Sequence, residues 1–170
     1  MKNFSKIKLL VMDVDGVMTN GSLSYGKNIK NLRSFNVRDG IGINLLHAQK
    51  IYTVIISGGS DEGIKERAKD LNIKYVFTKV KNKSKKLNFI QKKLNILCTE
   101  TVYIGDDIND LSVIPFVEFL LSPKNGHKSF IKHADMVLNS KGGQGVVREV
   151  ADKILKDKRI DLQTQIDSFK

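Results

Sequence analysis

The chain has 170 residues, of which 41% are hydrophobic, so it is expected to form one globular domain spanning 1–170. Its formal net charge of +11 raises the question of nucleic acid. However, the lysines are spread along the chain without a nucleic-acid-binding motif, so no nucleic-acid partner is expected. No stretch approaches the roughly 20 apolar residues of a membrane helix, and the single cysteine, Cys98, cannot form an internal disulfide. We therefore expect no membrane partner and a cytoplasmic location.

Short apolar strands alternate with helical patterns along the chain, and the first strand is expected at Ile7–Met12. Further strands are predicted at 52–56, 74–77, 101–104 and 117–121, each short enough for a buried parallel strand. Helices are predicted at 40–49, 61–71, 83–94, 107–113, 126–132 and 144–156. This alternation predicts an α/β fold with a doubly wound, Rossmann-like parallel sheet and right-handed crossovers.

One segment interrupts the alternation directly after the first strand. Leu23–Tyr25 and Leu32–Val37 flank a turn-like Gly26-Lys27-Asn28, which predicts an inserted β-hairpin at about 22–37. The last residues, about 158–170, are polar and weakly periodic. They predict either a frayed tail or an arm that orders on a neighbouring molecule.

Polar residues follow the predicted strands where each strand ends. In a doubly wound sheet, ligands bind at the carboxyl ends of the strands, so residues at these positions are expected to share one pocket. They are Asp13, Asp15 and Gly16 after the first strand, Ser57, Gly58 and Gly59 after the second, and Asp106, Asp107 and Asp110 after the fourth. Lys83 opens the helix after the third strand.

Asp13 and Asp15 are two carboxylates two residues apart just past a strand, so both can face one pocket while the turn at Gly16 redirects the chain. A carboxylate is a competent nucleophile toward phosphorus if the phosphoryl charge is neutralised, and magnesium prefers carboxylates and phosphate oxygens. The second aspartate can then protonate the leaving alkoxide and activate water. Acidic residues after a strand can also simply cap a turn, but Asp106 brings a third carboxylate to the same sheet edge, which favours a metal site.

Two further features are weaker signals for a phosphate site. Ser57 and Gly58 precede a predicted helix, where a hydroxyl and backbone N–H groups can hold phosphate, although Ser-Gly-Gly-Ser is also ordinary turn chemistry. Lys83 can pair with Asp13 and phosphate oxygens. Lys79, Lys81, Lys85 and Lys86 are rival candidates for that role.

The combination of these motifs resembles the haloacid dehalogenase superfamily of phosphatases over nearly the whole chain. The narrower resemblance is to the 3-deoxy-D-manno-octulosonate 8-phosphate phosphatase branch, which includes phosphatases of nonulosonate (sialic-acid-like) 9-phosphates. It is carried by DVDGVMTNG (13–21), FNVRDGIGI (35–43), YIGDDIND (103–110) and GGQGVVREV (142–150).

The resemblance implies a role for each residue that matches a motif. Asp13 is the nucleophile, Asp15 the general acid/base, and Lys83 stabilises the developing charge. Mg²⁺ is held by the Asp13 side chain, the Asp15 backbone carbonyl and Asp106, with Asp107 and Asp110 supporting the metal indirectly. Ser57 and Gly58 bind phosphate.

The resemblance also implies a fold without a separate cap domain and a homotetramer in which the hairpins pack together. Arg38, Asp39 and Arg148 then gain roles in substrate contact or assembly, although Arg148 can equally form an ion pair on a helix surface. One residue departs from the pattern, because the octulosonate phosphatases usually carry an arginine where this chain has Gly59. That departure leaves two substrates open, 3-deoxy-D-manno-octulosonate 8-phosphate and a nonulosonate 9-phosphate. A non-catalytic or weakly active relative of the cytidylyltransferase-associated domains is a further alternative.

A receiver-like signalling domain is the alternative from another functional class, because receivers also combine clustered aspartates, magnesium and a lysine on a doubly wound sheet. A receiver accepts phosphate on an aspartate after its third strand. No aspartate follows the predicted third strand at 74–77 directly. The phosphatase interpretation is therefore preferred.

Overall fold

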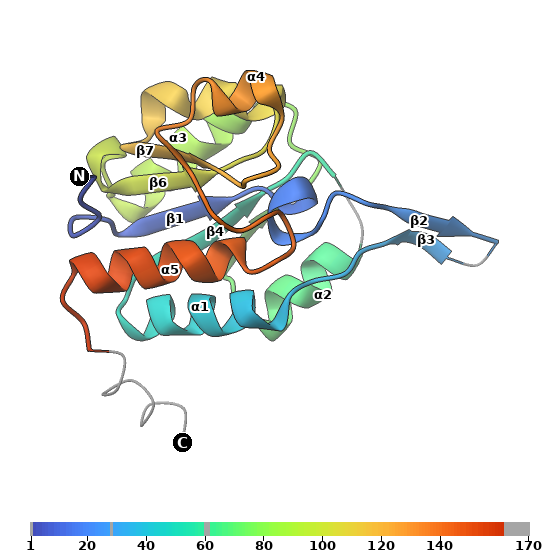
Figure 1. Ribbon diagram of the computed structural model, residues 1–170, viewed down its shortest axis with the longest axis horizontal. Coiled ribbons are helices and arrows are strands. Elements are labelled where there is room, and N and C mark those ends of the chain that lie inside the picture. The colour runs from blue at the N-terminus through green and yellow to red at the C-terminus, as the bar shows by residue number, and fades with distance from the viewer. Residues whose placement is uncertain (1, 28, 60–61, 162–170) are drawn as a thin grey trace.

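The computed structural model describes residues 2–27, 29–59 and 62–161. Its centre is a six-stranded parallel sheet with the order β5-β4-β1-β6-β7-β8 (Figure 1). The strands are β1 (Leu9–Met12), β4 (Tyr52–Ile56), β5 (Tyr75–Phe77), β6 (Thr101–Ile104), β7 (Phe119–Ser122) and β8 (Met136–Val137). The strand order reverses between β1 and β6, which is where doubly wound sheets bind ligands. The predicted fold class is confirmed.

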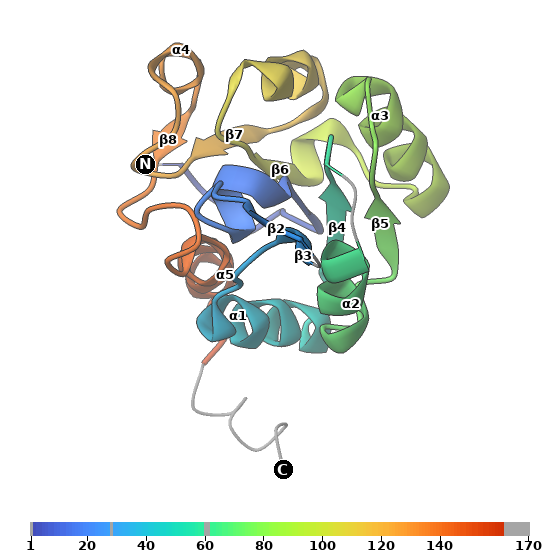
Figure 2. The ribbon, with the colours of Figure 1, turned by 90° about the vertical axis from the view of Figure 1, so that its right-hand side faces the viewer.

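Helices cover both faces of the sheet (Figure 2). On one face lie α1 (Val37–Ala48), α2 (Glu62–Asp70) and α5 (Val146–Asp157). On the other lie α3 (Lys83–Leu94), α4 (Lys128–Ile131) and the 3₁₀ helix η3 (Ile108–Phe116). Two short helical segments, η1 (Val14–Met18) and η2 (Cys98–Glu100), flank β1 and β6.

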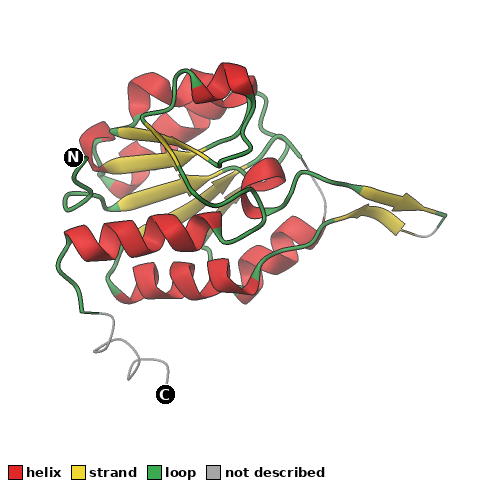
Figure 3. Ribbon diagram, in the orientation of Figure 1, coloured by secondary structure: helices red, strands yellow, loops and turns green. Residues whose placement is uncertain are grey.

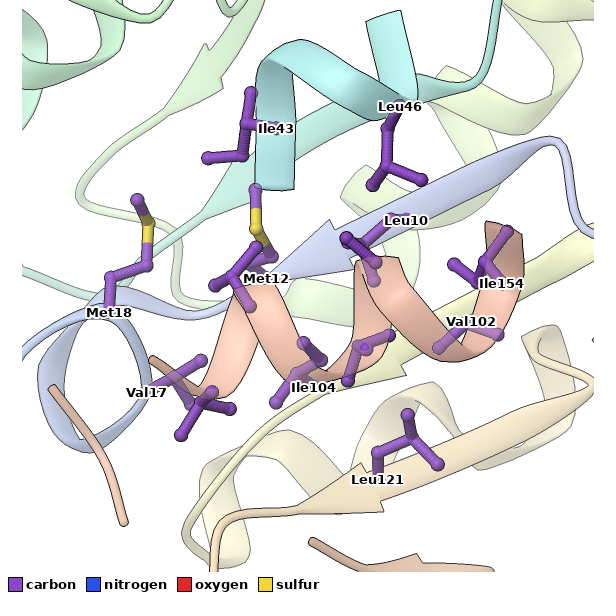
Figure 4. Close-up of a cluster of buried hydrophobic side chains, with 14 of the residues drawn as sticks. Leu10, Met12, Val17, Met18, Ile43, Leu46, Val102, Ile104, Leu121 and Ile154 are labelled. Carbon is purple, nitrogen blue, oxygen red and sulfur yellow. The ribbon is translucent and has the colours of Figure 1, made fainter. Parts of the chain in front are cut away.

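The central strand β1 contributes to a hydrophobic core on each face of the sheet. Leu10 and Met12 pack with α1 and α5 in one cluster (Figure 4), whereas Leu9 and Val11 pack with α3 and η3 in the other. Successive side chains of a strand point to opposite faces, so a strand buried on both sides is apolar throughout. These cores fix the end of β1, and with it the residues that follow.

A two-stranded hairpin of β2 (Ser24–Gly26) and β3 (Ile29–Leu32) projects from the body of the molecule (Figure 3). The predicted insertion is therefore present, but its return strand was placed too late, at 32–37. Asn36 instead accepts a hydrogen bond from the Arg38 N–H and so caps α1. Asn28, part of the predicted turn, lies outside the described residues.

Other element boundaries also differ from the sequence prediction. The predicted helix 107–113 is a 3₁₀ helix that continues to Phe116 and contains Pro115, which has no N–H to donate. Strand β8 was not predicted. The predicted helix start at Asp61 and the tail residues 162–170 lie outside the described residues. Among the helices described, none has both the length and the apolar character needed to cross a bilayer.

Candidate active site

Asp13 is the first residue after β1, and its position is fixed on both its backbone and its side chain. Its N–H donates to the Ile104 carbonyl at 3.0 Å, which continues the pairing of β1 with β6. Its Oδ1 accepts the Val14 N–H at 2.7 Å, and its Oδ2 lies 2.6 Å from Lys83 Nζ. One carboxylate oxygen of a buried aspartate is therefore held against a buried cation.

Lys83 is the first residue of α3, and Asn82 caps this helix by accepting the Lys85 N–H at 2.9 Å. Besides Asp13, the Lys83 ammonium contacts Asp110 Oδ1 at 2.5 Å. Burial alone would lower the pKa of Lys83, but the charges of Asp13 and Asp110 raise it above its ordinary value. Lys83 is thus a permanent cation in the site, and among the rival lysines it is the one beside Asp13.

Asp110 uses both carboxylate oxygens for contacts inside the protein. Its Oδ1 accepts the Tyr103 hydroxyl at 2.6 Å as well as Lys83, and its Oδ2 accepts the Asp106 N–H at 3.1 Å. Burial, followed by the charge of Asp110, raises the pKa of Tyr103 well above its ordinary value, so its hydroxyl remains a neutral donor. Asp110 therefore holds Lys83 and the turn that carries Asp106.

Asp106 follows β6 and approaches the backbone of Gly16 closely. A Cβ at Gly16 would lie 1.9 Å from Asp106 Oδ2, and Gly16 also has φ +82°, so only glycine suits this position. Ligand atoms of Asp13, Asp106 and Asp110 lie within 4.8 Å of one another. These three carboxylates thus meet at the carboxyl edge of the sheet, with Asp110 in the place where the sequence analysis had put Asp15.

The negative charge of Asp13, Asp106 and Asp110 exceeds the positive charge of Lys83 beside them. Burial, together with the charges of Asp13 and Asp110, raises the pKa of Asp106 to about 7. Burial and the charge of Asp110 likewise raise the pKa of Asp13 to about 6, although Lys83 opposes this. A second cation would relieve the repulsion, and a donor set made only of carboxylate oxygens fits Mg²⁺.

A cavity of about 430 Å³ opens over these carboxylates. It is lined by Asp13, Asp15, Gly21, Ser57, Gly58, Gly59, Asp106, Asp107, Ile108 and Asn109. The predicted residues that follow β1, β4 and β6 therefore share one cavity, with Lys83 and Asp110 bonded to Asp13 or to each other beside it. The lining combines four acidic side chains with a glycine-rich loop, so an anionic ligand requires a cation with it.

The loop after β4 gives the cavity its small polar groups. Ser57 Oγ accepts the Gly59 N–H at 3.1 Å, and the Ser57 N–H donates to the Phe77 carbonyl at 2.8 Å. On the opposite wall, Asp107 accepts the Ile108 N–H at 2.7 Å and so begins η3. Both walls are therefore set by hydrogen bonds at strand ends.

Arg33 is a site residue that the sequence analysis did not single out. Its Nε lies 2.7 Å from Asp15 Oδ1, and its Nη2 lies 2.9 Å from Asp15 Oδ2. This is the bidentate geometry in which guanidinium binds carboxylate most specifically. The contact depends on the direction in which the hairpin returns to the sheet, for which the sequence carries no local signal.

Arg38, Asp39 and Arg148 lie around α1 and α5 rather than beside Asp13. Arg38 and Arg148 line a separate cavity of about 450 Å³. Asp39 Oδ1 accepts the Arg148 N–H at 2.9 Å and so holds the start of α5, while Arg148 Nε pairs with Asp152 at 2.8 Å. Within one chain, the structure does not bring these three residues to the cavity over Asp13, and their contact with substrate stays a prediction.

Comparison with known proteins agrees with this geometry. Residues 73–150 match the haloacid dehalogenase-like hydrolase family. The 3-deoxy-D-manno-octulosonate 8-phosphate phosphatase of Salmonella typhi is 35% identical over 155 residues, which cover 91% of this chain and 82% of the relative.

Two solved structures of such phosphatases are also similar to the fold. One, from Moraxella catarrhalis in complex with magnesium, phosphate and KDO, has a TM-score of 0.91 at 34% identity and covers 98% of this chain and 95% of its own. The cobalt-bound form from Haemophilus influenzae has a TM-score of 0.89 at 32% identity, covering 93% and 92%. The chain belongs to the 3-deoxy-D-manno-octulosonate 8-phosphate phosphatase family of haloacid dehalogenase-like hydrolases.

Proposed function

We propose that this protein is a magnesium-dependent phosphatase that hydrolyses 3-deoxy-D-manno-octulosonate 8-phosphate through a phosphoryl group carried on Asp13. The observation that carries the proposal is the cluster of Asp13, Asp106 and Asp110, in which Lys83 bonds to two of the three carboxylates. A nucleophile, a cation site and a fixed positive charge are thereby gathered at the switch point of the sheet.

The metal would be held by the carboxylates of Asp13 and Asp106 and by the backbone carbonyl of Asp15. Asp110 would support it indirectly, because its side chain is fully buried and, unlike that of Asp13, does not line the cavity. When bound, Mg²⁺ supplies neutralising charge to the phosphoryl oxygens. The relatives solved with magnesium and with cobalt support a divalent cation at this site.

In the first step, a carboxylate oxygen of Asp13 attacks phosphorus, so an O–P bond forms while the bond from phosphorus to the sugar oxygen breaks. Lys83 keeps the Asp13 carboxylate oriented and offsets the charge of the transferred group. Asp15 gives a proton to the departing sugar oxygen. The Ser57 hydroxyl and the Gly58 N–H bind the phosphoryl oxygens, because the Ser57 and Gly59 N–H groups already donate within the protein.

In the second step, water attacks the phosphorus of the phosphorylated Asp13. Asp15, now a carboxylate, takes a proton from this water, and the O–P bond to Asp13 breaks to release inorganic phosphate. Both side chains line the cavity over the cluster, so one pocket serves both steps. The proton that Asp15 takes up replaces the one given to the sugar.

A second candidate substrate follows from Gly59. The described lining of the cavity contains no lysine or arginine, and residue 59 contributes no side chain. Because the arginine that the resemblance implies at this position is absent, a nonulosonate 9-phosphate stays the second candidate. The name of the Salmonella typhi relative favours the eight-carbon acid.

We extend the proposal to a homotetramer in which hairpins of neighbouring subunits pack together. Three large apolar side chains on or beside the hairpin are exposed, namely Leu23, Leu32 and Tyr25, which is 73% exposed. Apolar groups of this size on a projecting hairpin favour burial against another chain. Basic groups from a neighbour would then complete a cavity that has none among its described lining residues. The cytoplasmic location stays a prediction.

Phosphate release from a panel of substrates tests the function directly. The panel contains the octulosonate 8-phosphate and nonulosonate 9-phosphates, with and without Mg²⁺, and Asp13→Asn serves as the matched control. Preference for the eight-carbon acid is expected, whereas preference for a nine-carbon acid would select the second candidate. Residual activity of Asp13→Asn within tenfold of wild type would contradict the role of Asp13.

A further inference from the structure

The carboxylate of Asp15 is held by an arginine from the hairpin connection. Arg33 binds both oxygens of Asp15, at 2.7 and 2.9 Å, and Arg33 directly follows the end of β3. The other hydrogen bond given to this carboxylate, from Thr19 Oγ1, is longer at 3.4 Å. Arg33 therefore provides the shorter contacts that set the direction of the Asp15 side chain.

Gly59 leaves the space in which this pair lies. A Cβ at residue 59 would be 3.0 Å from Arg33 Nη2 and 3.0 Å from Asp15 Oδ2, and the next nearest atom, Ser57 Oγ, would be 3.5 Å away. A larger side chain at this position would have to displace the arginine, the aspartate or both. The glycine that departs from the family pattern and the arginine on the hairpin are thus matched to each other.

The exposed fractions of the Arg33 and Asp15 side chains indicate whether Arg33 binds the substrate itself or positions Asp15. The Arg33 side chain is only 3% exposed and is not among the residues lining the cavity, whereas the Asp15 side chain is 32% exposed and lines it. Arg33 is therefore covered, and Asp15 lies between it and the cavity. The contact that links Arg33 to the cavity lining is its bidentate pair with Asp15.

We propose that Arg33 is a positioning residue that holds Asp15 toward the leaving group, and that Gly59 is required because it makes room for this pair. The inference rests on the proposed function, in which Asp15 transfers the proton to the sugar oxygen. It makes the hairpin part of the catalytic apparatus in addition to any contact with a neighbouring chain. A lysine could not replace Arg33 fully, because an ammonium lacks the planar fork that binds both oxygens.

Two substrates with different leaving groups test this role. Departure of a sugar alkoxide needs a proton, whereas departure of the phenolate of 4-nitrophenyl phosphate does not. Arg33→Met is expected to lower kcat/KM for the sugar phosphate about 10- to 100-fold, part of the roughly 10²- to 10⁴-fold that a positioned acid or base contributes. For the aryl phosphate, kcat/KM is expected to change little, and Arg33→Lys should recover part of the loss on the sugar phosphate.

Lys65→Ala is the matched control, because it removes a cation from an exposed ion pair with Glu62. Equal losses on both substrates for Arg33→Met, or no loss on either, would overturn the positioning role. A fully active Arg33→Lys would show that charge suffices and would overturn the role of the bidentate contact.

A double-mutant cycle tests the match between Gly59 and Arg33 without relying on turnover. Gly59→Ala is expected to lower the midpoint of thermal unfolding in the wild-type background and clearly less in the Arg33→Met background. Additive shifts would overturn the match. A wild-type protein that hydrolyses neither substrate would instead overturn the proposed function and the positioning role of Arg33. The double-mutant cycle would still decide whether Gly59 and Arg33 are coupled.

Discussion

The ammonium group of Lys83 lies 2.6 Å from the carboxylate of Asp13, and this contact joins the start of α3 to the end of β1. The same ammonium contacts Asp110 at 2.5 Å, so one buried cation is shared by two buried carboxylates. The single positive charge of Lys83 is therefore already shared by Asp13 and Asp110, and the negative charge of Asp106 adds to the excess. The excess negative charge of the site and the stability of its buried groups both depend on this one lysine.

Lys83→Met should lower the free energy of unfolding by about 3–5 kcal/mol, the usual loss when one partner of a buried ion pair is removed. Asp13 and Asp110 would remain buried without their cation. Urea unfolding monitored by circular dichroism, in the presence of a chelator, measures the change.

Lys65→Met is the control for this measurement, since the side chains of Lys65 and Glu62 are exposed. Its effect should stay within about 0.5 kcal/mol. Similar losses for the two variants would contradict a special role for the buried contact.

Magnesium should stabilise the protein through Asp106. A ligand that binds only the folded state at 100 times its dissociation constant adds about 2.7 kcal/mol to the free energy of unfolding. Thermal unfolding with and without Mg²⁺ should therefore show an upward shift in wild type, and most of this shift should disappear in Asp106→Asn.

Asp70→Asn removes an exposed carboxylate that is not part of the cluster and should keep the full shift. A magnesium-dependent shift that is unchanged in Asp106→Asn would place the cation elsewhere. Without magnesium, Asp106→Asn should be at least as stable as wild type, because burial makes the charge of Asp106 unfavourable there.

Much of this site could be predicted because it depends on local sequence. A buried strand reads as a short apolar run, and the residue after it must lie at the sheet edge, so Asp13, Ser57 and Asp106 were assigned to one pocket. The central strands β4 and β6 have the predicted bounds for the same reason.

The contacts that were missed join elements whose relative directions the sequence does not encode locally. The pair of Asp15 and Arg33 depends on how the hairpin leaves and re-enters the sheet. The sequence pattern identifies Tyr103 only as a buried strand residue, so it could not predict the hydrogen bond from Tyr103 to Asp110. Strand β8 pairs through Met136–Val137 alone, which is too short to produce an alternating pattern.

The stability of the protein should depend on pH through Asp39. Burial raises the pKa of Asp39 to about 6, although hydrogen bonds from the Arg148 and Val147 N–H groups oppose the increase. A carboxyl group whose pKa is higher in the folded than in the unfolded state stabilises the fold when protonated. Its contribution therefore falls as pH rises from about 4 to about 6, by about 3 kcal/mol in all.

Asp39→Asn cannot ionise but keeps a side-chain oxygen to accept the Arg148 N–H. The free energy of unfolding, measured by urea titration across this pH range, should fall more steeply in wild type than in the variant. Parallel curves would show that Asp39 titrates normally. Comparing two proteins that differ at one residue cancels the contributions of Asp13 and Asp106, which titrate in the same region.

Gly142→Ala should displace the turn after β1 that contains Asp15 and Gly16, although Gly142 itself does not line the cavity. A Cβ at residue 142 would lie 1.9 Å from the Gly16 carbonyl oxygen, and this atom is backbone that no side-chain rotation can move. The neighbouring Gly143 N–H donates to the Val17 carbonyl at 2.9 Å, so the two loops pack backbone against backbone. Overpacking of this kind costs about 1–3 kcal/mol.

The same displacement should also reduce turnover, because Gly16 directly follows Asp15 and packs against Asp106. Lys141→Ala, which truncates the exposed neighbouring residue, should leave both stability and kcat unchanged. If Gly142→Ala lost stability but kept wild-type kcat at a temperature where it is folded, the contact would serve the fold alone. If the loop that contains Gly142 and Gly143 sets the position of Asp13 and Asp15, kcat should fall together with the stability.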